Sequence, residues 1–265
     1  MWALEVLKGV LSEAKPLNIG VTVTEIGNRS DADASWVSGI LNRQPIGVIL
    51  IFSNLAASER SMLSARHIPF VIFDPAGDPY PSDFSVQADN WTGGILATRH
   101  LISLGHKRIG VITGPDTMLC SRARLDGYMA ALAEHGITSD NNLIARGDFT
   151  TVSGYNQSIK MLDDADNRPT AIFAGSDLQA MGTYEAARQL GIRIPEDLSV
   201  VGFDDIQTSA FMGPSLTTIH QPLAEMTQRA ARIILGKAHS KMEQRHIIMP
   251  TSLIIRDSTR PPLLG

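Results

Sequence analysis

The sequence predicts an α/β protein built on two doubly wound, mostly parallel sheets. Helical and strand patterns alternate strictly along the chain. The predicted strands are short, apolar and rich in β-branched residues, as in Val48 to Phe52 and Ile109 to Thr113. Such strands between helices indicate a parallel sheet covered on both faces. An irregular stretch, Asp74 to Pro79, interrupts the alternation before it resumes, so two sheets explain the pattern most economically.

The first set of elements opens on a helix. Apolar residues recur at helical spacing from Leu4 to Ala14, and the run from Ile19 to Val23 alternates like a strand. A doubly wound sheet normally begins with a strand, so we expect the complete fold to start upstream of Met1. The further elements predicted here are a helix at 30–42, a strand at 48–52, a helix at 56–66, strands at 70–73 and 84–88, and a helix at 91–104.

The second set repeats the same logic. Its predicted strands are 109–113, 143–146, 171–174, 198–203 and 216–220, and its predicted helices are 121–135, 152–162 and 177–190. A helix at 223–235 and strands at 245–249 and 252–256 follow, and these late strands could join either sheet. No flexible linker separates the sets, so we expect close crossovers between two subdomains. One would contain residues 1–104 and 223–250, and the other 105–222 and 251–265.

Composition excludes several classes of protein. The formal net charge is −4 and the pI is near 6.0, so the chain has no excess positive charge with which to grip a phosphate backbone. A single cysteine, Cys120, rules out an intramolecular disulfide framework. No apolar run is long enough to span a bilayer. We therefore expect a cytoplasmic protein with no membrane partner, which weighs against a secreted solute-binding protein.

Polar side chains follow several predicted strands, where ligands of open α/β sheets bind. The helix after the strand at 109–113 begins with Arg122 and Arg124, and an arginine there can present its fork of donors to a ligand hydroxyl or carboxylate. The alternative is that both arginines are solvated or pair with Asp126. Asp204 and Asp205 directly follow a buried strand and could accept hydrogen bonds from hydroxyl donors, or could stabilise a turn or cap a short helix.

Three further side chains occupy comparable positions. Ser176 could contact a ligand but is also a typical N-cap residue, with Asp177 well placed against the helix dipole. Gln221, before Pro222, carries an amide that can both donate to and accept from a sugar hydroxyl pair. Phe149 could cover the C–H face of a sugar, although a single aromatic after a strand is often ordinary packing.

Catalytic motifs are absent. The sequence contains no nucleophile elbow, Walker phosphate loop, dinucleotide fingerprint or zinc-protease motif. Its histidines are scattered, and His100 and His106 suit helix and turn contacts better than metal ligation. We therefore expect no enzyme activity, no cofactor and no metal.

Four segments strongly resemble the lactose-repressor family of bacterial transcriptional regulators. They occur in the family's order along nearly the whole chain: Asp89 to Gly110, Ser121 to Tyr128, Ile194 to Asp205, and Leu216 to Pro222. The resemblance implies a fold like that of type I periplasmic binding proteins, with two subdomains, three crossovers and an effector cleft between them. It also implies a homodimer controlled by a small-molecule effector, here expected to be a mono- or oligosaccharide, with a purine or a phosphorylated sugar as alternatives.

The resemblance also assigns effector contacts. Arg124 and Asp204 match the family's principal effector-contacting arginine and aspartate. Ser176, Phe149 and Gln221 match positions that often line the pocket. Trp2 and Asp89 are weaker matches at the wall of the first subdomain's pocket.

Family members read operator DNA with an N-terminal helix-turn-helix. Nothing before Met1 is present in this sequence, so we expect this chain to sense an effector and to reach DNA only through such a head. Two other functions remain in competition. A free-standing sugar-binding protein of a transport system would share the architecture, and a sugar-modifying enzyme would need a poised acid, base or nucleophile.

Overall fold

The chain divides into two compact units, each described here by itself. The structure is a computed structural model that describes residues 2–25, 35–53, 55–236 and 244–263. The larger unit comprises residues 1–2, 88–222 and 250–265, and the smaller unit comprises residues 3–87 and 223–249. Among the described helices, none is long and apolar enough to cross a membrane.

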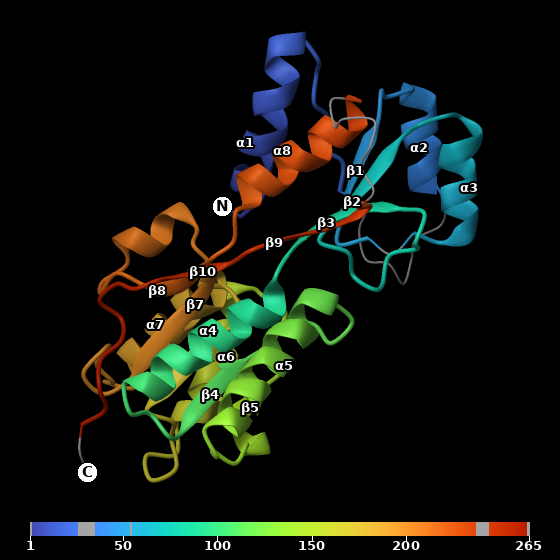
Figure 1. The fold of residues 1–265 in the computed structure, drawn as a ribbon. Helices are drawn as coiled ribbons and strands as arrows, with labels where there is room; N and C mark the ends of the chain where they lie inside the picture. Colours follow the sequence, from blue (N-terminus) through green and yellow to red (C-terminus); the bar gives the residue numbers. More distant parts are fainter. Residues whose placement is uncertain (1, 26–34, 54, 237–243, 264–265) are drawn as a thin grey trace. The chain divides into compact units, whose positions relative to one another are not determined.

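The smaller unit is built on a four-stranded sheet in the order β1-β2-β3-β9 (Figure 1). Strands β1, β2 and β3 are parallel. Helix α8 packs on β2, and α1 is joined to α8 by an ion pair between Glu13 and Arg232 at 2.8 Å. The elements are α1 (Trp2–Ala14), α2 (Ser35–Arg43), β1 (Val48–Ile51), α3 (Ala57–Ala65), β2 (Phe70–Phe73), β3 (Phe84–Ala88), α8 (Leu223–Ile234) and β9 (His246–Met249).

The larger unit is built on a six-stranded sheet in the order β10-β8-β7-β6-β4-β5 (Figure 1). All of its strand pairs are parallel except β10 with β8. The strands are β4 (Ile109–Ile112), β5 (Ile144–Ala145), β6 (Ala171–Ala174), β7 (Ser199–Asp204), β8 (Thr217–His220) and β10 (Ser252–Ile254). The helices are α4 (Asn90–Ser103), α5 (Leu119–Glu134), α6 (Thr151–Leu162) and α7 (Asp177–Gln189), with 3-10 turns η3 (Asn141–Leu143) and η4 (Gln207–Phe211).

Both faces of this sheet are buried, which explains why its strands are apolar without alternation. Val111 and Phe173 belong to a core cluster that includes Leu101 of α4 and Leu132 of α5. Their neighbours in sequence, including Ile112, belong to a second cluster formed with residues of α6 and α7. Successive side chains of a strand point to opposite faces. The sheet is therefore doubly wound, as the sequence predicts.

Two glycines fix how α4 and α5 cross. A Cβ at Gly94 would overlap the carbonyl oxygen of Arg124, and a Cβ at Gly127 would overlap that of Trp91. The two helices therefore touch backbone to backbone, a separation that larger residues do not permit. This crossing sets the position from which Arg124 leaves α5.

Most predicted elements are confirmed to within about two residues at each end, which is the usual uncertainty of helix and strand limits. The strand predicted at Ile19 to Val23 is wrong. That run forms no strand, Val23 is 70% exposed, and the only described neighbour of β1 in its sheet is β2. A segment in which apolar and polar residues alternate forms a strand only when a neighbouring strand pairs with it through backbone hydrogen bonds, and none of the described segments pairs with this run. The first part of the helix predicted at 30–42 lies outside the described residues, and α2 begins at Ser35.

The subdomain limit predicted at residue 104 also differs from the structure. The larger unit begins at Ala88, so α4 belongs to it. The reason is the glycine-lined crossing of α4 and α5, together with the packing of Ala97 and Leu101 of α4 into the core of the six-stranded sheet.

Candidate functional site

The carboxyl ends of β4, β6, β7 and β8 meet at one edge of the larger sheet, where the sequence predicts a ligand site. Gly175 and Ser176 follow β6, Asp204 ends β7, and Gln221 follows β8. Arg124 reaches this edge from α5. The structure therefore brings residues from four separate segments to one place.

Arg124 is buried and firmly held. Its Nε donates to Asn90 Oδ1 at 2.9 Å, and its Nη1 donates to the carbonyl oxygen of Gly175 at 2.5 Å. The guanidinium carbon lies 3.6 Å from the centroid of the Phe203 ring, a cation–π contact. Guanidinium carries five N–H donors, so after these two hydrogen bonds three N–H groups of Arg124 remain to donate.

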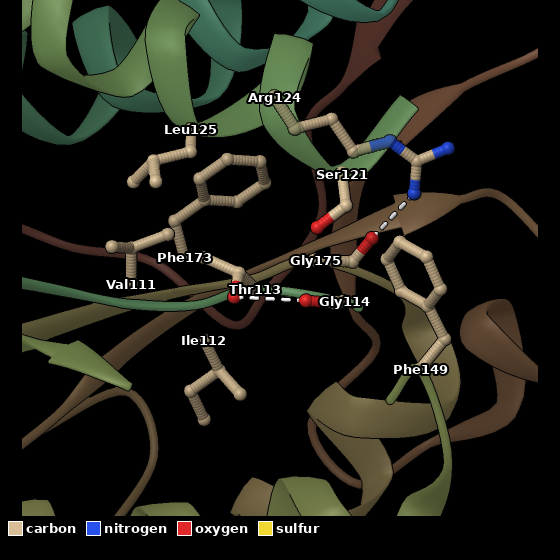
Figure 2. A pocket seen from close by; sticks show the side chains of 10 residues that line it. All are labelled: Val111, Ile112, Thr113, Gly114, Ser121, Arg124, Leu125, Phe149, Phe173 and Gly175. Carbon is tan, nitrogen blue, oxygen red and sulfur yellow. Dashed lines mark hydrogen bonds between the residues drawn. The ribbon is translucent and has the colours of Figure 1, made fainter. Parts of the chain in front are cut away.

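Figure 2 shows this arrangement, with one terminal nitrogen of Arg124 on Gly175 and the other directed away from the side chains drawn. The residues around it, Thr113, Ser121, Phe149 and Phe173 among others, leave almost no space that a water molecule could occupy. Ordinary ligand pockets, by contrast, have volumes of roughly 300–1,000 Å³. The described pocket is therefore too small to enclose a sugar by itself.

Asp204 stands opposite Arg124 and completes a buried pair of opposite charges. Arg124 Nη1 and Asp204 Oδ1 are 3.9 Å apart, and both side chains are over nine-tenths buried. That separation is too long for a direct hydrogen bond. Gln221 Nε2 donates to Asp204 Oδ1 at 2.5 Å, whereas the buried Oε1 of Gln221 has no hydrogen-bond partner among the described residues.

Phe149 and Ser176 are joined to each other. The Ser176 hydroxyl donates to the carbonyl of Phe149 at 3.0 Å and accepts from the backbone N–H of Gln179 at 3.1 Å. Ser176 is thus the N-cap of α7, the structural alternative that the sequence left open. Phe149 has a φ of 67°, and its ring lies where a Cβ of Gly114 would be, 5.2 Å from the guanidinium carbon of Arg124.

Asp205 has a different role from Asp204. Its carboxylate lies 3.0 Å from His220 Nδ1 and accepts from Arg256 at 2.6 Å. Burial acts to raise the pKa of Asp205, but the hydrogen bonds from His220 and Arg256 outweigh it and hold that pKa below its ordinary value. Asp205 is therefore ionised, and its carboxylate links the end of β7 to β8 and to the segment after β10.

Neither of the two weaker candidates makes a described hydrogen bond to Arg124, Asp204 or Gln221. Asp89 is the N-cap of α4, and its two carboxylate oxygens accept from the backbone N–H and the hydroxyl of Thr92 at 3.0 and 2.7 Å. Trp2 begins α1 and is partly exposed. Their assignment as effector contacts stays a prediction.

Sequence reasoning left the choice open for the arginines and missed several partners. Arg122 is exposed and donates to the backbone of Asp116, so the solvated alternative holds for Arg122 and fails for Arg124. Asn90 and Phe203, which hold Arg124, were not singled out. Neither carries a local signal, because each is recognisable only once α4, β7 and α5 are packed.

In the smaller unit, Asp74 was also missed. It follows β2 directly, is 3% exposed and has a φ of 50°. The signal was available, since Asp74 follows its strand as directly as Asp205 follows β7.

The histidines expected to be structural do make structural contacts. His106 is buried, with Nδ1 2.8 Å from the Thr170 hydroxyl and Nε2 2.9 Å from the carbonyl oxygen of Arg260. Burial lowers the pKa of His106. Within the described part of the chain, no group of three or more His, Cys, Asp or Glu side chains is arranged to hold a metal ion.

Known proteins share both the sequence and the fold. Residues 98–259 match the periplasmic binding protein-like domain. The HTH-type transcriptional repressor CytR of Escherichia coli is 34% identical over 261 residues, which cover 97% of this chain and 75% of CytR. The chain belongs to the LacI family of transcriptional regulators. It corresponds to the family's effector-binding domain, and the resemblance drawn from its motifs is confirmed.

Solved LacI-family structures superpose closely. The complex of the transcriptional regulator CelR with cellobiose has a TM-score of 0.86 and 29% identity, covering 97% of this chain and 79% of that one. A LacI family regulator from Enterococcus faecium with bound ribose has a TM-score of 0.85 and 25% identity, covering 98% and 94%. The lac repressor dimer bound to operator and the anti-inducer ONPF has a TM-score of 0.82 and 27% identity, covering 97% and 88%. The predicted α/β, periplasmic-binding-protein-like fold class is thus confirmed, and the chain is the ligand-sensing part of a transcriptional regulator.

Proposed function

We propose that the larger unit binds a neutral, hydroxyl-rich small molecule, a mono- or oligosaccharide, through Arg124, Asp204 and Gln221. The observation that carries this proposal is the 3.9 Å separation between Arg124 Nη1 and Asp204 Oδ1. A ligand hydroxyl placed beside both groups can accept from the guanidinium and donate to the carboxylate. The pair then gains two charge-assisted hydrogen bonds that it lacks by itself.

The neighbouring groups favour the same class of ligand. Gln221 Oε1 is buried without a partner, and leaving such an acceptor unsatisfied is costly, so a second hydroxyl donor would stabilise it. The positive charge of Arg124 is balanced by the negative charge of Asp204. A balanced pair gives no net attraction to a phosphate, which argues for a neutral sugar over a phosphorylated one.

Phe149 supplies the apolar wall. Its ring lies beside Arg124, and the hydrogen bond from Ser176 fixes its backbone. Sugar C–H groups pack well on such a ring. The CelR complex with cellobiose and the E. faecium regulator with ribose agree with this class of ligand.

Binding would control repression in the manner of a two-state regulator. A ligand shifts a conformational equilibrium only by its difference in affinity for the two states. We expect the chain to act as a homodimer in the cytoplasm, as in the lac repressor dimer on its operator, and to release any bound sugar chemically unchanged.

The test is thermal stabilisation of the purified chain by a panel of neutral sugars, sugar phosphates, nucleosides and purines, since a ligand that binds only the native state raises its melting temperature. The variant Arg124→Ala should lose the shift. The matched control is Arg122→Ala, which removes an exposed arginine two residues away on the same helix and should keep it. A shift that survives Arg124→Ala, or one given only by phosphorylated compounds, would contradict the proposal.

A further inference from the structure

We propose that Asp177 is a positioning residue that sets the backbone at Asp204 and thereby the geometry of the ligand contact. The inference rests on the proposed function of the Asp204 site. Asp177 opens α7, and its side chain is completely buried. It touches none of Arg124, Gln221 and Phe149 through a described hydrogen bond, so it acts through the loop that follows β7.

The Asp177 carboxylate accepts three hydrogen bonds from two different segments. Oδ2 accepts from the backbone N–H of Ile206 at 2.9 Å and from the hydroxyl of Ser209 in η4 at 2.6 Å. Oδ1 accepts from the hydroxyl of Thr218 in β8 at 2.5 Å. One oxygen therefore holds the loop after Asp204, and the other holds the strand beside it.

The loop that Asp177 holds has an unusual backbone. Asp204 has a φ of 118° and Asp205 a φ of 57°, so two successive residues that are not glycine lie in the left-handed region. Such conformations persist only where the surroundings determine them. Asp205 is fixed by His220 and Arg256, and the hydrogen bonds to Asp177 begin at the next residue, Ile206.

The sheet makes room for this carboxylate. A Cβ at Gly202 of β7 would overlap Asp177 Oδ1, so only glycine at that position admits the Asp177 side chain against the strand. Within three residues of one strand, Gly202 thus leaves space for the Asp177 carboxylate and Asp204 provides the proposed contact to the ligand. A purely capping aspartate at the start of α7 would need neither this space nor the contacts to Ile206 and Ser209.

The experiment compares two variants that each remove one hydroxyl donor from Asp177. Ser209→Ala breaks the loop contact, and the matched control Thr218→Val breaks the strand contact. Both hydroxyls belong to fully buried residues, so the losses of stability should be similar. Amide hydrogen exchange of the segment 203–211 is measured without ligand, and affinities for D-ribose and cellobiose are measured by calorimetry.

We expect Ser209→Ala to raise exchange at Ile206 and to weaken binding of whichever of the two sugars the wild type binds by roughly five- to tenfold, the size of one buried hydrogen bond. Thr218→Val should change both readouts less than about twofold. In an Asp204→Asn background, Ser209→Ala should have no further effect on affinity, because its influence passes through Asp204.

Equal exchange at Ile206 in the two variants would overturn the positioning role, and so would an undiminished effect of Ser209→Ala in the Asp204→Asn background. If the wild type binds neither D-ribose nor cellobiose, those sugars are excluded as effectors, and the exchange measurement still decides the role of Asp177.

Discussion

Replacing Asp177 by asparagine should change how the stability of the larger unit depends on pH. Burial raises the pKa of Asp177 from its ordinary 3.8 to about 6, the hydrogen bonds from Ser209, Thr218 and Ile206 oppose this rise, and the charge of Asp205 adds to it. The native state therefore binds the proton more tightly than the unfolded state does. An asparagine at this position can keep the contacts if its oxygen faces Ile206 and Ser209 and its NH₂ faces Thr218, whose hydroxyl can accept.

The sign and size follow from linkage. Below pH 3.8 the Asp177 carboxyl is protonated in both the native and the unfolded state, so its titration takes nothing from the free energy of unfolding. As the pH rises through about 6, the native state must ionise a buried group, and stability is lost. The difference between 3.8 and about 6 corresponds to about 3 kcal/mol. Wild type should therefore lose about 3 kcal/mol relative to Asp177→Asn between roughly pH 4 and pH 7.

The assay is the free energy of opening of β6 and β7, measured by amide hydrogen exchange at a series of pH values in both proteins. These strands belong to the core of the larger unit, so their exchange reports that unit separately. Titrating groups that do not interact with Asp177 cancel in the difference between the two proteins, whereas Asp205, whose charge acts on Asp177, contributes to it. If the opening free energies of the two proteins stay parallel from pH 4 to pH 7, Asp177 does not titrate with a raised pKa.

Three further substitutions test the packing. Tyr128→Phe should lower the free energy of unfolding, measured with denaturant, by about 1–3 kcal/mol, because the buried carbonyl of Ile109 loses its 2.8 Å hydrogen bond. The control is Tyr155→Phe, because the Tyr155 hydroxyl donates to an exposed glutamine. An equal or smaller loss for Tyr128→Phe than for this control would contradict the prediction. Gly94→Ala should lower both the stability of the protein and its affinity for sugar, because the new Cβ overlaps the backbone of Arg124. The control Gly39→Ala in α2 places its Cβ in open space and should stabilise the protein by roughly 0.5–1 kcal/mol. Equal melting temperatures for the two variants would show that α4 and α5 can separate freely. Arg60→Met should lower the free energy of unfolding by roughly 3–5 kcal/mol, because buried Asp83 loses the two hydrogen bonds, at 3.0 and 2.7 Å, that Arg60 donates to it. An unchanged free energy of unfolding in urea would mean that Asp83 is solvated.

The sequence predicts the elements of the larger unit well for a physical reason. Its strands are buried on both faces, and its helices carry caps such as Asp89, Thr150 and Ser176 that mark their starts. The run from Ile19 to Val23 misleads because alternation describes a half-buried strand only where a neighbouring strand exists.

The arrangement of the candidate site could be predicted in part. Arg124, Asp204 and Gln221 follow from positions at strand ends and from family motifs, and the structure places these three side chains together. The contacts from Asn90, the carbonyl of Gly175 and the ring of Phe203 could not be predicted, because they depend on the distance at which α4 and α5 cross. Spacing alone also could not separate Arg122 from Arg124, since only packing decides which arginine is buried.

A crystal structure of the protein with the neutral sugar that gives the largest thermal shift would show directly whether Arg124 and Asp204 hold the ligand. We expect one sugar hydroxyl within hydrogen-bond distance, about 2.6–3.2 Å, of both the Arg124 guanidinium and the Asp204 carboxylate. We expect a second hydroxyl to donate to Gln221 Oε1. A sugar bound with Arg124 and Asp204 still 3.9 Å apart and no ligand atom beside either group would contradict the proposal.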